Sequence, residues 1–250
     1  MRFAAKSDIG LVRKLNQDAY MVRPTGRDSC IVVVADGMGG SAAGEVASAL
    51  ALRVVTEELA RGGSADDAQA RLSQAVQSAN AEIYRQAVLV EAYAGMGTTI
   101  VAAEVDQHQA TIAHVGDSRA YHLSADGVLS QLTHDHSLVN ELIRRGQLSS
   151  VEAAVHPQRH VLTRSLGTLP NVAVDCRVWP WAPGDLFLVC SDGLTSLVDE
   201  TELKDCLSKE RPLAEKVTAL VATALHAGGY DNITVAVLAN DGDAKWGDCG

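Results

Sequence analysis

Ile31-Val32-Val33-Val34-Ala35 is an uninterrupted apolar run, and it ends abruptly at Asp36-Gly37-Met38-Gly39-Gly40. Four of its five residues are β-branched and none is polar, which predicts a strand that is buried on both faces. Such a strand lies inside a layered domain rather than at its surface. The run therefore predicts a layered fold and places a carboxylate, Asp36, at the end of a buried strand.

The segments on the C-terminal side of this run predict helices in pairs and strands in groups. Apolar residues recur with helical spacing over 43–60 and again over 64–87, with Gly62-Gly63 between them. Because strands and helices do not alternate regularly, we expect an α+β domain with mostly antiparallel sheets. Further strands are predicted at 98–105, 110–115, 121–123, 128–132, 186–190 and 233–238, and further helices near 138–144, 200–208 and 213–227.

Composition limits the class of partner. The chain has 250 residues, of which 47% are hydrophobic, so a sizeable core can form and a disordered chain is excluded. The net charge of −10 disfavours nucleic acid or an anionic membrane as the main partner. It does not disfavour anionic substrates, because a bound cation reverses the sign of a local site.

The cysteines and the hydropathy pattern bear on the compartment. Five cysteines without a CxxC pair predict reduced thiols rather than a disulfide framework. No apolar run approaches the roughly 20 residues that a membrane span needs, so we expect no membrane insertion. We predict a cytoplasmic protein with a single domain over residues 1–240 and a frayed tail over 241–250.

Aspartates stand at the ends of several apolar strands. Asp36, Asp117 and Asp192 each end one, Asp231 directly precedes the last strand, and Asp18 precedes a short apolar segment. A single Asp-Gly pair is more simply a turn, but a turn does not require an apolar strand before it. Carboxylates that converge without basic partners repel each other, and a hard divalent cation removes that repulsion. No Cys/His cluster has zinc spacing, so Mg²⁺ or Mn²⁺ fits better.

The same pattern suggests a reaction. Two such ions about 3.5–4 Å apart activate a shared water for attack on phosphorus, which indicates metal-assisted hydrolysis of a phosphate ester. Arg13 offers a guanidinium that matches phosphate oxygens, although taken alone it is more simply a surface arginine, and Lys14 could serve equally. No cysteine stands in a CxxxxxR arrangement, which disfavours a cysteinyl-phosphate mechanism.

Seven segments together carry a more specific pattern; they are 7–18, 34–40 with 43–45, 95–99, 114–119, 162–167, 191–194 and 231–234. In this order they resemble the PP2C-type (PPM) metal-dependent serine/threonine protein phosphatases in their compact bacterial form, across residues 7–238. The resemblance implies an α+β four-layer sandwich, in which two central, mainly antiparallel sheets are flanked by pairs of antiparallel helices. It also implies hydrolysis of phosphoserine and phosphothreonine by a water that bridges two Mn²⁺ or Mg²⁺ ions.

The resemblance also implies roles for single residues. Asp18 is expected to hydrogen-bond to metal waters, and Arg13 to bind the phosphate. Residues 134–168 match a flap beside the active site. The implied metal ligands are Asp36 bridging both ions, the Gly37 carbonyl on the second ion, Asp192 and Asp231 on the first, and Asp117 with Asp192 on a possible third. The candidate substrate contacts on the flap are Ser137, Arg144, Arg145, His160 and Arg164.

Three positions depart from the family's pattern. Met38 and Ser41 stand where relatives carry histidines, one of which is a proposed general acid. A metal-bound water is therefore our default proton donor to the leaving hydroxyl, with His136 or His160 of the flap as alternatives. Gln17 stands where many members have a glutamate that reaches a metal through water, so we expect weaker affinity for the second ion rather than inactivity.

Two further features favour structural roles over functional ones. His134 and His136 bracket Asp135, but no third metal ligand lies nearby in the sequence, so we expect solvated flap residues. Trp179 and Trp181 are typical of an edge-strand or loop anchor rather than a ligand platform.

Two other functions remain open at this stage. One is a catalytically inactive phosphoprotein-binding module, and the other is a phosphatase of small-molecule phosphate esters. The expected partners are phosphoserine and phosphothreonine proteins, which the resemblance implies are substrates of a bacterial Ser/Thr kinase. We expect a monomer. The sequence does not identify the physiological substrate, the kinase or the choice between manganese and magnesium.

Overall fold

The computed structural model describes residues 1–26, 29–40, 43–61 and 67–242. Ser41, the helix break at Gly62-Gly63 and most of the predicted tail lie outside these residues. The boundary of the single domain at residue 240 therefore stays a prediction.

Two antiparallel sheets form the centre of the described chain. The first runs, in spatial order, through β1 (Arg2–Asp8), β11 (Ile233–Ala239), β10 (Leu186–Cys190), β7 (Arg119–Leu123) and β8 (Leu129–Gln131). The second runs through β2 (Asp18–Pro24), β3 (Cys30–Met38), β5 (Ile100–Val105), β6 (Gln109–Val115) and β9 (Asp175–Pro180), and the short β4 (Gly97–Thr98) pairs with β3.

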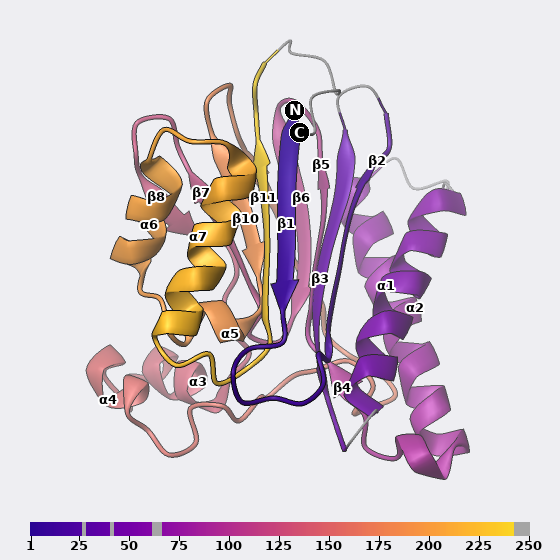
Figure 1. Ribbon diagram of the computed structural model, residues 1–250. Helices are drawn as coiled ribbons and strands as arrows, with labels where there is room; N and C mark the ends of the chain where they lie inside the picture. The colour runs from indigo at the N-terminus through magenta and orange to yellow at the C-terminus, as the bar shows by residue number, and fades with distance from the viewer. Residues whose placement is uncertain (27–28, 41–42, 62–66, 243–250) are drawn as a thin grey trace.

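A pair of helices covers the outer face of each sheet, as Figure 1 shows. Helices α1 (Ala43–Arg61) and α2 (Ala68–Leu89) pack on the second sheet, and α6 (Glu200–Ser208) and α7 (Leu213–His226) pack on the first. The four layers confirm the predicted α+β sandwich of two antiparallel sheets between helical pairs. The predicted helices differ from the observed ones by only a few residues at each end.

Strand β3 explains why the fold has four layers. Its side chains alternate between two cores, so Val33 and Ala35 pack toward α1 and α2 while Val32 and Val34 pack against the other sheet. All four are fully buried. Because neither face meets water, the strand shows no polar alternation, and the prediction of two-faced burial is confirmed.

The segment predicted as a flap leaves the sandwich at one end, below the sheets in Figure 1. It contains the short helices α3 (Leu138–Arg144) and α4 (Ser150–Ala154). Isolated bridges between Ser137 and Leu162 and between Thr98 and Leu166 close its base. The first bridge joins the two ends of the flap to each other, and the second ties the C-terminal end of the flap to β4.

The strands that the sequence did not predict are β1, β2 and β9. They are the outermost strands of their sheets and are mostly half-buried, so they lack a continuous apolar run. Trp179 lies in β9, as expected for an edge-strand anchor. No helix of the described residues is long and apolar enough to cross a membrane. The four cysteines in the described residues are unpaired, which fits the prediction of free thiols.

Candidate metal and phosphate site

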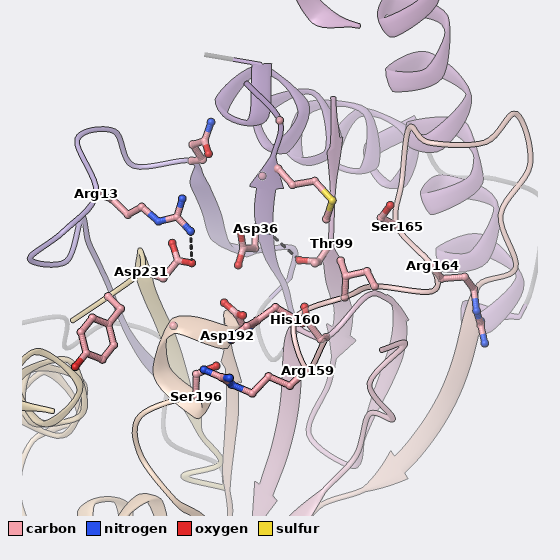
Figure 2. Close-up of a pocket in the computed structure, with 18 of the residues that line it drawn as sticks. Arg13, Asp36, Thr99, Arg159, His160, Arg164, Ser165, Asp192, Ser196 and Asp231 are labelled. Atoms are coloured by element: carbon pink, nitrogen blue, oxygen red, sulfur yellow. Dashed lines mark hydrogen bonds and ion pairs between the residues drawn. The ribbon is translucent and has the colours of Figure 1, made fainter. Parts of the chain in front are cut away.

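The carboxylates predicted at strand ends converge at the end of the sandwich that carries the flap. Antiparallel register sets Asp18 of β2 directly opposite Asp36 of β3. Asp192 begins the short helix α5 (Asp192–Thr195) just after β10, and Asp231 lies just before the neighbouring strand β11. Asp117 lies in the loop that joins β6 of one sheet to β7 of the other. Figure 2 shows Asp36, Asp192 and Asp231 around one space.

The glycine after each of two aspartates permits a close backbone approach. A Cβ on Gly37 would lie 2.1 Å from the carbonyl oxygen of Gly44, and one on Gly193 would lie 2.0 Å from that of Asn232. Neither glycine has a positive φ. The Asp-Gly pairs are therefore not the turns that such a pair most simply predicts, because β3 continues through Gly37 and α5 through Gly193.

Hydroxyl groups hold the carboxylate-bearing backbone in place. The Thr99 hydroxyl accepts a hydrogen bond from the Asp36 backbone N–H at 3.0 Å and lies 2.7 Å from the Ser118 hydroxyl. The Ser191 hydroxyl donates to Asp18 Oδ2 at 2.8 Å and accepts from the Thr234 N–H. Each group bonds a segment that bears a carboxylate to another strand or loop, so the site is rigid.

Electrostatics at the site favour a cation. Burial, followed by the charge of neighbouring carboxylates, raises the pKa of Asp18 to about 7 and that of Asp117 to about 8. The pKa values of Asp36 and Asp192 are raised for the same reasons. Asp18 Oδ1 and Asp192 Oδ1 are buried without a hydrogen-bond partner among the described residues. Buried carboxylate oxygens that lack hydrogen-bond partners fit an oxygen-ligated divalent ion such as Mn²⁺ or Mg²⁺.

Arg13 reaches the same site from the loop between β1 and β2. Its Nη2 atom lies 2.7 Å from Asp231 Oδ2, and its side chain is about half exposed. Arg13 lines a cleft of about 1060 Å³ together with Asp36, Asp192 and Asp231. Lys14, the alternative raised by the sequence, does not line this cleft, so the geometry favours Arg13 as the phosphate-binding side chain.

The flap residues fall into two groups. His160 and Arg164 line the cleft, and Ser137 lines a second cavity of about 330 Å³ that shares Asp117 and Asp192 with it. Arg144 and Arg145 line neither cavity, so their contact with substrate stays a prediction. The sequence did not single out Arg159, which lines both cavities, because the extended part of the flap has no periodic pattern that would mark an inward side.

Comparison with known proteins agrees with this geometry. The family model for protein phosphatase 2C matches residues 12–237. The chain belongs to the protein phosphatase 2C family. Serine/threonine phosphatase Stp of Listeria monocytogenes is 43% identical over 239 residues, which are 94% of each chain. Protein phosphatase PhpP of Streptococcus pneumoniae is 37% identical over 250 residues, which are 98% of this chain and 100% of that protein.

Solved structures of this family share the fold. The Mycobacterium tuberculosis serine/threonine phosphatase PstP/Ppp superposes with a TM-score of 0.85 at 38% identity, covering 94% of this chain and 97% of that one. The catalytic domain of PstP in complex with two manganese ions superposes with a TM-score of 0.82 at 36% identity, covering 94% and 96%.

His136 of this phosphatase 2C chain does not behave as a solvated flap residue. It is buried, with 3% of its surface exposed, and does not line the cleft. Its Nδ1 accepts a hydrogen bond from the Gly116 N–H at 3.0 Å, so the ring proton lies on Nε2, which donates to Asp175 at 3.2 Å. The prediction that His136 is solvated is wrong, and its ring cannot reach a leaving group; His134 is exposed, as predicted.

Asp135 and His136 hold the Asp117 loop from both sides. Asp135 accepts hydrogen bonds from Arg119, from Nε at 2.9 and 3.1 Å and from Nη2 at 2.7 Å. The backbone N–H of His136 donates to the Gly116 carbonyl at 2.9 Å, which adds to the side-chain contact with the same residue. Since these two residues begin the flap, the root of the flap and the loop that bears Asp117 form one unit.

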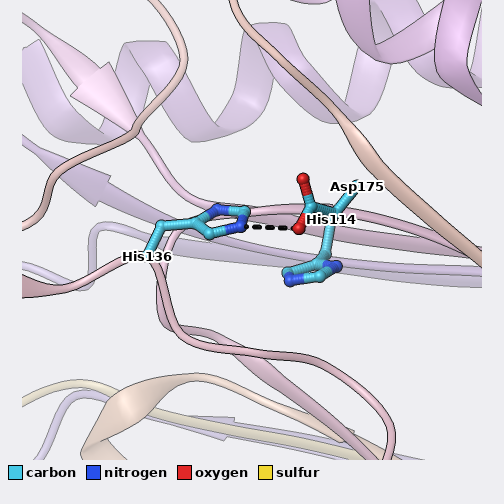
Figure 3. Close-up of side chains that lie close together, drawn as sticks. All are labelled: His114, His136 and Asp175. Carbon is cyan, nitrogen blue, oxygen red and sulfur yellow. Dashed lines mark hydrogen bonds and ion pairs between the residues drawn. The ribbon is translucent and has the colours of Figure 1, made fainter. Parts of the chain in front are cut away.

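The cluster of His114, His136 and Asp175 in Figure 3 looks like a metal site but fits a structural role better. The two rings stack with centroids 4.8 Å apart. Burial lowers the pKa of His136 to about 4 and also lowers that of His114, so both rings are neutral near pH 7. With Nδ1 of His136 accepting from Gly116, a metal on Nε2 would require the anionic imidazolate. The cluster therefore packs the root of the flap.

We expect Mn²⁺ binding to release protons at pH 7. The raised pKa values of Asp18 and Asp117 mean that these carboxyls are partly protonated at that pH, whereas an ion binds the ionised form. The apparent affinity should therefore rise from about pH 6 to about pH 9, and the protons released by these two carboxyls should fall toward zero above that range. Titration calorimetry in two buffers of different ionisation enthalpy measures the proton count. Equal heats in both buffers at pH 7 would contradict the raised pKa values.

We expect His136→Leu to weaken the most weakly held ion about tenfold, because it leaves the Gly116 N–H unpaired beside Asp117. His136→Asn keeps an acceptor near the Nδ1 position and should retain most of the affinity. The measurement is calorimetric Mn²⁺ titration, with thermal unfolding of both variants without metal as a control for stability. Equal Mn²⁺ affinities for the two variants would show that the contact with Gly116 does not position Asp117.

Proposed function

We propose that this chain is a manganese- or magnesium-dependent protein phosphatase that hydrolyses phosphoserine and phosphothreonine. The observation that carries this proposal is the convergence of four half-buried aspartates with Arg13 at one cleft, with Asp18 paired in register beside Asp36. The names of the relatives support the reaction, since Stp is a serine/threonine phosphatase and PhpP a protein phosphatase. The PstP structure with two manganese ions supports the choice of metal.

The metal ligands proposed from the sequence fit the geometry. Burial, followed by the charges of the neighbouring carboxylates, raises the pKa of Asp36, and this central position suits a ligand shared by two ions. Asp192 and Asp231 enter from the adjacent strands β10 and β11 and suit the first ion. The Gly37 carbonyl would be a ligand of the second ion. Asp117 is proposed, with Asp192, for a third ion, because both line the cavity on the flap side.

The protein's own groups bind and orient the phosphate. When bound, the divalent ions neutralise the substrate's charge and lower the pKa of the water that attacks phosphorus. Arg13 binds phosphate oxygens from the rim of the cleft, and its contact with Asp231 keeps the guanidinium beside the metal ligands. Asp18 lies behind Asp36 and is fixed by Ser191, so its free Oδ1 can accept a hydrogen bond from an ordered water.

The burial of His136 removes one candidate for the proton donor to the leaving hydroxyl. His160 is the histidine among the described cleft residues, and it is exposed on the flap. Met38 also lines the cleft and has no proton to donate. We therefore keep water in the metal site as the donor and His160 as the side-chain alternative.

Membership of the family supports a proposal on the substrates, the oligomeric state and the compartment. We propose that the substrates are phosphoproteins made by a bacterial Ser/Thr kinase, and that the phosphatase acts as a monomer in the cytoplasm. The unpaired cysteines among the described residues support a reducing compartment.

A phosphothreonine peptide tests the function directly. With Mn²⁺ the protein should release phosphate, and excess EDTA should abolish the release because the carboxylates alone cannot activate water. A malachite-green phosphate assay on the purified protein measures both rates. Equal rates with Mn²⁺ and with EDTA would exclude the metal mechanism, and binding without turnover at any Mn²⁺ concentration would favour an inactive phosphoprotein-binding module.

Asp192→Asn should lower kcat by a factor of about 10³ or more, because the position needs charge for metal rather than for packing. Asp117→Ala should leave the two core ions bound and reduce kcat less severely. Circular dichroism and thermal unfolding should show both variants folded. A fully active Asp192→Asn protein with its metals bound would overturn the ligand assignment.

A further inference from the structure

Exposed apolar side chains gather on the loop between β1 and β2 and on the neighbouring Tyr230, which lines the cleft. Leu11, Val12 and Tyr230 expose 69%, 60% and 63% of their surfaces. Ile9 and Leu15 are also exposed. We call these five residues the apolar rim. Exposed apolar side chains that gather in one place on a folded domain often mark a site where another molecule binds.

The apolar rim is held in place rather than left loose. The loop between β1 and β2 is closed at its base by the Asn232 side chain, whose Nδ2 donates to the carbonyls of Ile9 and Leu15 at 2.9 and 3.0 Å. The Leu11 N–H donates to the Gly229 carbonyl at 2.8 Å, which joins this loop to the one that bears Tyr230. The apolar side chains of the rim are therefore exposed to solvent although the loop that carries most of them is anchored.

The apolar rim is continuous with the catalytic cleft. Val12 directly precedes Arg13, and Tyr230 directly precedes Asp231. Tyr230, Arg13 and Asp231 all line the cleft. A peptide whose phosphorylated residue lies at Arg13 advances at most about 3.6 Å per residue. Residues one to three positions from the phosphorylated one are therefore close enough to reach the rim.

We infer that the apolar rim binds an apolar side chain of the phosphoprotein substrate, within three residues of the phosphorylated one. The occupant is an extended phosphopeptide segment that carries a residue such as leucine or phenylalanine at that distance. This inference rests on the proposed binding of the phosphate by Arg13. It adds a preference for sequence to a site whose metals and guanidinium recognise only the phosphate.

Three phosphothreonine peptides of equal length and charge test the inference. One has serine at the neighbouring positions, one has leucine on the N-terminal side, and one has leucine on the C-terminal side. The parent protein should hydrolyse at least one leucine peptide with a kcat/KM about fivefold above the serine peptide, as expected for partial burial of one leucine. Equal kcat/KM for all three peptides would overturn the inference.

Matched variants locate the effect. Leu11→Ser and Val12→Ser should each remove most of the leucine preference. Val128→Ser is the control, because Val128 is as exposed as Val12 (59% against 60%) but lies in the β7–β8 hairpin, at the end of β7 away from Asp117. It should keep the full preference. A leucine preference that survives in both rim variants, or that Val128→Ser also removes, would overturn the inference.

Two further readouts test for damage to the cleft and for self-association through the rim. Each kcat/KM for a peptide is divided by the kcat/KM of the same protein for nitrophenyl phosphate, which has no flanking residues. If a rim variant loses kcat/KM for this ester to the same extent as for the leucine peptide, the substitution has damaged the cleft, and the inference is overturned. Sedimentation of the parent and of Val12→Ser tests the rim as a contact between two copies, and a dimer lost in the variant would also overturn it. If no peptide is hydrolysed with Mn²⁺, the proposed function fails instead.

Discussion

The repulsion among buried carboxylates is the interaction on which the rest of this structure depends. Asp18, Asp36 and Asp192 are brought together by strands whose remaining residues are packed in apolar cores. The fold therefore confines negative charge where water cannot screen it, as the raised pKa values record. Such a site binds protons or cations, and the hydroxyl groups around it prevent the carboxylates from moving apart.

Rigidity at this point comes from backbone contacts that admit no side chain. The absence of a Cβ at Gly37 lets the end of β3 touch the start of α1, and the absence of one at Gly193 lets α5 touch the loop before β11. The aspartate before each glycine is thereby fixed through its own backbone. The Asp-Gly pairs thus serve to bring segments close, which explains why both follow buried strands without making a turn.

What the sequence could predict depended on local patterns. The continuous apolar run predicted β3, and helical periodicity predicted both helical pairs. The order of the short motifs predicted which aspartates belong to the site. The outer strands β1 and β2 were not predicted, because their half-buried residues show no clear alternation of apolar and polar side chains. The pairing of Asp18 with Asp36 could not be predicted, because it depends on the register between β2 and β3. The burial of His136 could not be predicted either, because its partners Gly116 and Asp175 lie 20 and 39 residues away.

The two walls of the cleft are attached to different carboxylates. The flap begins at Asp135 and His136, which hold the residues on either side of Asp117. The opposite wall is fixed through Asn232, next to Asp231. The flap is therefore anchored beside Asp117, whereas the opposite wall is anchored beside Asp231. A substrate that touches both walls would therefore contact two segments that are anchored beside different carboxylates.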